Sequence, residues 1–201
     1  MLLFGFAVST SLAFSLGQAV VAAVWIFQYG TARKTRGYSE GRESVVRDDR
    51  FKTVGKVIFA VNNLVTLASF WTSSKPLCLF SDTDGFRRAG LVVLAASALL
   101  CVKSMRDLGT NYSPCFDSHK PFQIVTKGIY RWVRHPLYLA NILQGLGYAL
   151  ASSSMWVVVL SAYGIFKIVR ALLREESYLR KAFPEYKRYQ SRTSRLIPFV
   201  Y

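Results

Sequence analysis

The chain has 201 residues, of which 52% are hydrophobic and 18% charged, and its formal net charge is +15 at pH 7. This length suits one domain. In ordinary soluble domains about a quarter of the residues are charged, so the composition argues against a soluble globular protein. The basic residues flank apolar runs, which is typical of a membrane protein and argues against nucleic-acid binding.

Long uncharged runs organise the chain, and they cover residues 1–32, 57–74, 89–102 and 136–166. A membrane-spanning helix needs about 20 mostly apolar residues, so the last run is too long for one span. It is interrupted by Ala151-Ser152-Ser153-Ser154, which we interpret as a tight turn between two helices. The sequence therefore predicts an all-α membrane bundle with about five transmembrane helices, at 3–28, 54–73, 87–105, 136–151 and 155–173.

The distribution of basic residues predicts the orientation of these spans. Segments 29–56, 103–135 and 167–201 hold eight, six and nine Lys or Arg, whereas 73–88 holds three. With five spans, the three rich segments fall on one side, so the positive-inside tendency places the amino terminus outside and the carboxyl terminus in the cytoplasm. We expect a multi-pass protein of the endoplasmic reticulum in a eukaryote or of the plasma membrane in a prokaryote, in contact with membrane lipids.

The first half of the chain offers few chemical signals. The run 1–32 lacks a basic start and is longer than a signal peptide requires, so we expect a retained helix. Segment 33–52 mixes both charge signs and should be a mobile cytoplasmic loop, with a short surface helix as the alternative. The three cysteines, Cys78, Cys101 and Cys115, are odd in number and lack metal-ligand spacing, which predicts neither a structural disulfide nor a metal site.

The segment 128–138 places two arginines and a histidine against the uncharged run 136–166. A polar cluster at the edge of a membrane is costly unless it binds something. Proline favours the first turn of a helix, so Pro136 should begin one, with Arg134 and His135 at the end that attracts anions. The alternative for any single residue here is anchoring at the membrane surface.

The carboxyl-terminal segment extends the last span. Apolar residues recur at helical spacing as far as Phe183, so the fifth helix should continue beyond the bilayer as an amphipathic helix. Glu176 is four residues before Arg180 and can pair with it. Glu175 has Leu179 at that distance, which leaves Glu175 freer to bind a ligand.

Several motifs in the second half of the chain occur together. They are Asp107-Leu108-Gly109 with Tyr112, Gly128-Ile129-Tyr130, Arg134-His135-Pro136-Leu137-Tyr138, Glu175-Glu176, Phe183, Tyr186, Tyr189 and Arg195-Leu196-Ile197-Pro198. In their order and spacing, residues 100–201 resemble the isoprenylcysteine carboxyl methyltransferases, which are integral membrane enzymes, and more distantly the phospholipid N-methyltransferases. The resemblance divides one membrane domain, 1–201, into amino-terminal spans at 1–105 and a cytoplasmic cofactor-binding and catalytic region at 106–201.

The resemblance implies a membrane methyltransferase that uses S-adenosylmethionine and no metal. It implies that the cofactor contacts Gln123, Ile124, Val125, Gly128, Tyr130, His135, Pro136, Tyr138, Glu175 and Glu176. The family places a substrate-contacting arginine at the position of Ala171, so Arg170 and Arg174 are the candidates to replace it, with Arg134 as a third catalytic candidate. The implied acceptor is lipophilic, with the carboxylate of a prenylated cysteine as the first candidate, and no obligate protein partner is evident.

The acceptor decides which further groups are needed. A carboxylate needs only an arginine to orient it, whereas a lipid amine must lose a proton, which would give His135 or Glu176 a role. We expect His119 to be a solvated loop residue. Two other functions remain open from the sequence, an NADPH-dependent membrane sterol or lipid reductase and a non-enzymatic lipid-binding membrane subunit.

Overall fold

The computed structural model describes residues 42–47, 49–71, 84–113, 115 and 117–198, together with the single positions 19, 23, 26 and 30. Its elements are β1 (Ser44–Arg47), α2 (Asp49–Trp71), α3 (Asp84–Leu108), η1 (Gly109–Asn111), β2 (Asp117–His119), η2 (Gly128–Arg131), α4 (Pro136–Ser152), α5 (Met155–Ala182) and α6 (Tyr186–Gln190). The first predicted span, 3–28, lies outside the continuously described residues, as does Cys78. The other four predicted spans coincide with α2 to α5.

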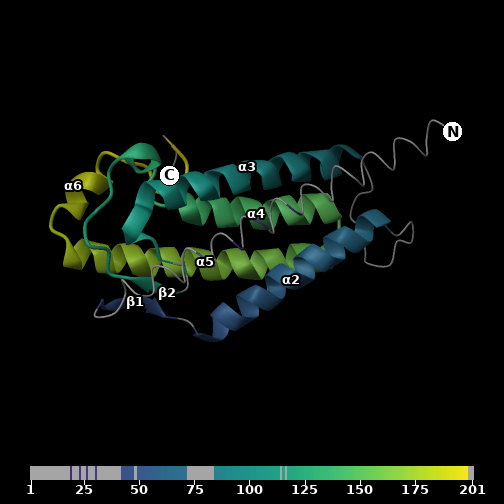
Figure 1. Ribbon diagram of the computed structural model, residues 1–201, viewed down its shortest axis with the longest axis horizontal. Coiled ribbons are helices and arrows are strands. Elements are labelled where there is room, and N and C mark those ends of the chain that lie inside the picture. The colour runs from purple at the N-terminus through teal and green to yellow at the C-terminus, as the bar shows by residue number, and fades with distance from the viewer. Residues whose placement is uncertain are drawn as a thin grey trace.

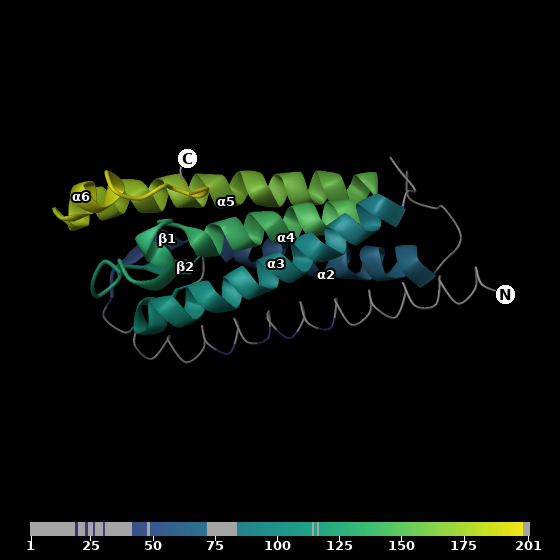
Figure 2. The ribbon, with the colours of Figure 1, turned by 90° about the horizontal axis from the view of Figure 1, so that it is seen from above.

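The long helices form one elongated bundle in which α4 packs against both α3 and α5. Helix α2 crosses the others obliquely and contacts α4 and α5 (Figures 1 and 2). Among the described residues, Gly85–Asn111 and Met155–Ala182 are each long and apolar enough to cross a membrane, and Thr53–Thr66 is a shorter apolar stretch. The structure thus fits a helical membrane protein, and the number of five spans stays a prediction.

Glycines allow α3 and α4 to approach closely. A Cβ atom added to Gly90 would lie 2.4 Å from the backbone nitrogen of Ala151, and one added to Gly147 would lie 2.8 Å from Cγ of Leu94. Small residues at such positions are common between membrane helices, because packing rather than water exclusion holds these helices together. Helix α2 is joined to its neighbours by polar contacts, from Asn62 Nδ2 to Ser161 Oγ at 3.2 Å and from Tyr148 Oη to Asn63 Oδ1 at 3.0 Å.

The predicted turn between the last two long helices is present. Helix α4 ends at Ser152 and α5 begins at Met155. Ser153 adopts a left-handed conformation with φ 51°, and its N–H donates to the carbonyl of Ala149 at 3.2 Å. Helix α5 then runs for 28 residues to Ala182, which confirms that it continues past the predicted span.

A small β-sheet is a correction to the all-α prediction. Strand β1 lies in the segment predicted to be a mobile loop, and it pairs antiparallel with β2, with Ser44 opposite His119 and an irregularity before Val46. A two-stranded ribbon is marginal by itself, so neighbouring contacts must support it. The Tyr178 hydroxyl of α5 donates to Glu43 Oε2 at 2.5 Å, and Arg42 Nε donates to the carbonyl of Lys120 at 2.7 Å.

The sheet and α6 lie at one end of the bundle, where α3 ends, α4 begins and α5 ends (Figure 1). We call this the pocket end, because the polar segments of the second half of the chain converge there.

Candidate functional site

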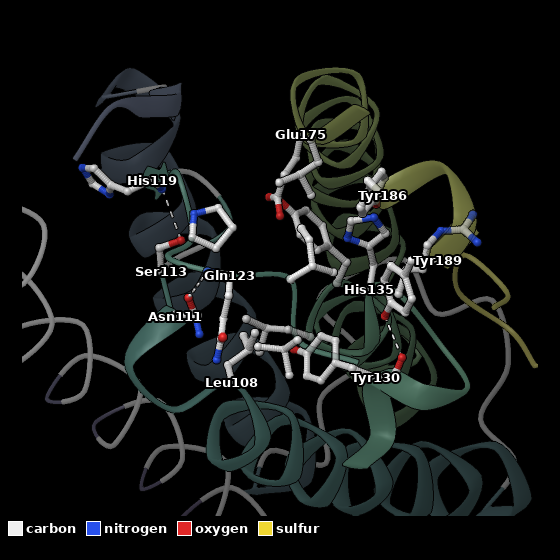
Figure 3. A pocket seen from close by; sticks show the side chains of 17 residues that line it. Leu108, Asn111, Ser113, His119, Gln123, Tyr130, His135, Glu175, Tyr186 and Tyr189 are labelled. Atoms are coloured by element: carbon white, nitrogen blue, oxygen red, sulfur yellow. Dashed lines mark hydrogen bonds between the residues drawn. The ribbon is translucent and has the colours of Figure 1, made fainter. Parts of the chain in front are cut away.

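A pocket at this end is lined by residues from α3, the loop that follows it, η2, α4, α5 and α6 (Figure 3). It holds about 670 Å³ of empty space, including space open to solvent. Eight of the predicted site residues line it: Gln123, Ile124, Val125, Tyr130, Arg134, His135, Tyr138 and Glu175. These residues lie up to 52 positions apart in the sequence, so the fold brings the separate motifs to one place.

Two side chains from the end of α3 and the turn after it position the loop wall of the pocket. Asn111 Oδ1 accepts the N–H groups of Phe122 at 2.8 Å and Gln123 at 3.3 Å. Asp107 Oδ2 accepts the N–H of Ile129 at 2.8 Å. Gly128 has φ 60°, and a Cβ there would lie 2.2 Å from this carboxylate oxygen, so glycine is required both by conformation and by space.

The start of α4 forms another wall. Pro136 occupies the first turn and His135 the N-cap position, as predicted, and no side chain caps this helix end. Leu137 and Tyr138, whose N–H groups belong to the first helical turn, both line the pocket. Since the first N–H groups of a helix lack partners within it, this end can receive an anionic group of a ligand.

Glu175 extends from α5 towards α4. Its Oε2 accepts a hydrogen bond of 2.5 Å from the hydroxyl of Tyr138, which is itself 4% exposed. Tyr138 also packs edge-on against the His135 ring, with 5.4 Å between the ring centroids. This contact fixes one carboxylate oxygen of Glu175 at the pocket, beside the amino-terminal turn of α4.

Glu176, the next residue, turns away from the pocket into a cluster of cations. Only 1% of its side chain is exposed. Oε1 accepts Arg134 Nε at 3.0 Å, and Oε2 accepts Arg195 Nε at 3.0 Å and Arg180 Nη2 at 3.4 Å. The predicted pairing with Arg180 is therefore present, but Arg180 is half exposed and forms the longest of the three contacts.

These contacts bind residues 186–195, which we call the closing segment, to the start of α4. The N–H groups of Arg134 and His135 donate to the carbonyls of Ser194 and Arg195 at 2.9 and 3.1 Å. Arg134 Nη1 also donates to the carbonyl of Gln190 at 3.1 Å and to that of Thr193. The closing segment contributes Tyr186 and Tyr189 to the pocket, so Glu176 and Arg134 hold a wall of the pocket in place.

Burial keeps the pocket tyrosines neutral. Removal from water raises the pKa of Tyr130 well above its usual value, and it likewise raises the pKa of Tyr186 and of Tyr189. The hydroxyl of Tyr189 donates to the carbonyl of Tyr130 at 2.6 Å. The site therefore presents tyrosine hydroxyls as neutral hydrogen-bond donors at all physiological pH values.

Two buried polar atoms of the pocket have no hydrogen-bond partner among the described residues: Nε2 of His135 and the hydroxyl oxygen of Tyr186. His135 Nε2 lies 3.3 Å from Glu176 Oε1, so it already has an electrostatic contact with this carboxylate, whereas the Tyr186 hydroxyl has no hydrogen-bond partner within the described residues. An unsatisfied buried polar group costs about 1–3 kcal/mol, and such groups in a pocket are satisfied when a ligand or ordered water supplies the partner. The Tyr186 hydroxyl is thus available to a polar ligand.

The other predicted site residues lie outside the lining. Gly128 and Pro136 shape the backbone of η2 and α4 beside the pocket, and Glu176 lies behind it. Arg170 and Arg174 are exposed on the side of α5 that faces away from Glu176. The structure brings the third predicted catalytic arginine, Arg134, to the pocket and does not bring these two.

Sequence reasoning missed several lining residues. Asn111 and Ser113 carried no signal, and Tyr186 and Tyr189 belonged to a motif without an assigned role. His119 was predicted to be a solvated loop residue; it lies in β2 at the edge of the pocket, and its ring points away from the other labelled side chains (Figure 3).

The second half of the chain is similar to known proteins. Residues 86–186 match the sequence pattern of the family described as phospholipid methyltransferase. The chain is 26% identical over 135 residues to protein-S-isoprenylcysteine O-methyltransferase of Mus musculus. The aligned residues are 65% of this chain and 46% of that enzyme. It is 37% identical over 76 residues to the cobalt-zinc-cadmium resistance protein CzcN of Cupriavidus metallidurans, covering 37% of this chain and 35% of that protein.

A further relative is the nickel-cobalt-cadmium resistance protein NccN of Alcaligenes xylosoxydans xylosoxydans, 31% identical over 80 residues, which are 39% of this chain and 38% of that protein. The chain thus matches less than half the length of each of these relatives.

Proposed function

Because the chain belongs to the phospholipid methyltransferase family, we propose that it transfers a methyl group from S-adenosylmethionine to a lipophilic acceptor at the membrane. The observation that carries this proposal is the pocket at the polar end of an apolar bundle. It combines the Glu175 carboxylate, the uncapped start of α4 and the buried Tyr186 hydroxyl, which has no hydrogen-bond partner among the described residues. A water-soluble donor and a membrane-dissolved acceptor can meet at such a boundary.

The chemical groups of the pocket fit those of S-adenosylmethionine. Glu175 suits the ribose hydroxyls or the ammonium group of the methionine moiety, and the amino-terminal turn of α4 suits its carboxylate. The hydroxyl of Tyr186 offers a hydrogen bond to a remaining polar atom. When bound, this cofactor supplies an electrophilic methyl group on a positively charged sulfur.

The contribution of the protein to the reaction would be alignment and exclusion of water. Holding two reactants in line can supply about 7–11 kcal/mol of the barrier in favourable cases. Leu108, Leu137 and Leu179 line the pocket together with the neutral tyrosines, so the site is partly apolar. No covalent enzyme intermediate is needed for such a displacement.

For the acceptor, we propose the carboxylate of a prenylated cysteine as the first candidate. A carboxylate nucleophile needs a cation that orients it, and Arg134 is the predicted catalytic arginine that lines the pocket. A lipid amine is the second candidate, and His135 would then accept the proton that the ammonium group must lose. In a membrane, the pocket end would face the cytoplasm, and the acceptor would enter from the adjacent leaflet.

The other functions that the sequence left open are less well supported. The family match and the mouse relative favour a methyltransferase over an NADPH-dependent reductase. The buried Tyr186 hydroxyl, which has no hydrogen-bond partner among the described residues, favours ligand binding over a purely structural role for this end of the bundle.

A methyl-transfer screen tests the proposal. Purified full-length protein in lipid nanodiscs is incubated with methyl-labelled S-adenosylmethionine and with a prenylcysteine, a phospholipid amine or a lipophilic thiol. We expect label in the lipid extract for one acceptor class, and the prenylcysteine is the acceptor expected to carry it. No transfer to any acceptor class by a preparation that binds the cofactor would contradict the proposed acceptor chemistry.

A further inference from the structure

Helix α5 has an exposed face that is distinct from the one that carries Glu175. One turn of an α-helix takes 3.6 residues, so positions 156, 159, 163, 166, 170 and 174 share a face. All six are exposed: Trp156, Val159, Tyr163, Phe166, Arg170 and Arg174. The face is therefore apolar and aromatic from Trp156 to Phe166 and becomes cationic at Arg170.

The change from apolar to cationic occurs within the depth of a membrane. With a rise of 1.5 Å per residue, Arg170 lies about 21 Å and Arg174 about 27 Å along the helix from Trp156. The hydrocarbon core of a bilayer is about 30 Å thick, and tryptophan favours its boundary. If Trp156 marks one boundary, the backbone of both arginines lies inside the opposite one, and their side chains must extend towards the head groups at the pocket end.

The charge of these two arginines is not balanced within the described part of the chain. No carboxylate there lies within ion-pair distance of Arg170 or Arg174. The nearest acids in sequence, Glu175 and Glu176, are engaged on the other side of the helix with Tyr138 and with Arg134, Arg180 and Arg195. Arg170 rests over the ring of Phe166, with 5.6 Å from its guanidinium carbon to the ring centroid.

The spacing of the two arginines suits one shared anion. Residues four apart on a helix have Cβ atoms about 5–6 Å apart, so two like charges there repel each other unless an anion lies between them. Guanidinium groups bind phosphate through two parallel hydrogen bonds. A partner for an otherwise apolar helix face at this depth must itself dissolve in the membrane, which excludes free phosphate and acidic peptides.

We propose that Arg170 and Arg174 form a binding site for the phosphate of an anionic phospholipid in the leaflet at the pocket end. The acyl chains would lie along the apolar part of the same face, over Phe166, Tyr163 and Val159. The bound lipid would neutralise the pair and fix α5 at membrane depth, with Glu175 held on the other side of that helix. This site is separate from the pocket and does not depend on the methyl-transfer activity.

Lipid retention tests the site. Full-length protein is incorporated into nanodiscs with equal amounts of phosphatidylcholine and phosphatidylglycerol, extracted in mild detergent, and its bound lipids are counted by native mass spectrometry. We expect phosphatidylglycerol to be enriched on the wild-type protein and the enrichment to fall about tenfold in Arg170→Gln/Arg174→Gln, since each basic side chain near an anionic surface contributes to lipid binding. High salt should lower the wild-type enrichment in the same direction.

The matched control removes two other exposed arginines, in Arg188→Gln/Arg192→Gln, which lie in α6 and beyond it. This variant should retain phosphatidylglycerol as the wild type does. Three results would overturn the site. The Arg170/Arg174 variant could retain as much phosphatidylglycerol as the wild type, the control could lose as much as that variant, or the wild-type protein could show no enrichment. Cofactor affinity, measured on the same samples, reports separately on the pocket and so distinguishes a failure of the proposed function from a failure of the lipid site.

Discussion

Replacing Glu176 with alanine is expected to destabilise the protein by about 3–5 kcal/mol and to open the pocket, because it leaves buried guanidinium groups without their counter-charge. Glu176 is 1% exposed, and Arg134, one of its partners, is 9% exposed. Arg134 and Arg195 would then retain the backbone contacts of the closing segment but lose the carboxylate that joins them to α5. The free energy of unfolding in mild detergent, from denaturant titration, is the direct measurement.

The control for this variant is Glu185→Ala, which removes an exposed acid at the start of α6. A surface substitution of this kind should change stability by no more than about 0.5 kcal/mol. The variant Glu176→Gln keeps the shape and should fall between the two. If Glu176→Ala unfolds at the same denaturant concentration as the control, the carboxylate does not hold the closing segment to α5.

Replacing Glu175 with alanine is expected to weaken binding of S-adenosylmethionine about 10- to 100-fold while leaving the fold intact, since a hydrogen bond to a charged group is worth about 1.5–3 kcal/mol. Glu175 is half-buried, and it accepts a hydrogen bond from the Tyr138 hydroxyl. Removing the Glu175 carboxylate should therefore change the stability of the fold little, but it deprives the ligand of a charged contact. Isothermal titration calorimetry gives the affinity, and the thermal unfolding midpoint checks the fold.

Tyr138→Phe is the companion variant, because it deletes the hydroxyl that orients Glu175 and keeps the carboxylate and the ring. We expect it to lose less affinity than Glu175→Ala. Cofactor affinity that is the same in wild type and Glu175→Ala would remove Glu175 from the site, whatever happens to Tyr138→Phe.

The pairing of the last two long helices could be predicted because it depends on local signals. The uncharged run is too long for one span, and the serines at its middle break it where Ser153 adopts a left-handed conformation. The start of α4 at Pro136 follows equally from the fixed φ of proline. The continuation of α5 to Ala182 follows from the helical spacing of its apolar residues.

The β-sheet could not be predicted in this way. Its strands are three or four residues long and lie about 70 positions apart, and neither alternates apolar and polar residues over a useful length. They pair because the chain before α2 and the loop after α3 both meet the end of α5. Tertiary contacts of this kind, such as that of Glu43 with Tyr178, leave no periodic pattern in the sequence.

The motifs of the candidate site could be predicted from the sequence. The helix faces on which their side chains lie could be predicted less well. Arg170 and Arg174 were the candidates because they lie near Ala171, where the resemblance implies an arginine. At 100° per residue, however, they lie about 140° and 100° from Glu175 around the helix. That rotation alone places them on another face. The role of Glu176 was only partly visible, since Arg180 is near it in sequence whereas Arg134 is 42 residues away.

The central claim is that the pocket at the end of the bundle binds S-adenosylmethionine, and an equilibrium titration tests it most directly. Purified full-length protein is titrated with S-adenosylmethionine and, in parallel, with NADPH, and S-adenosylhomocysteine is added as competitor. We predict saturable binding of S-adenosylmethionine that the competitor displaces and that Glu175→Ala weakens, with no saturable binding of NADPH. Folded protein that binds NADPH and not S-adenosylmethionine, or neither of them, would contradict the claim.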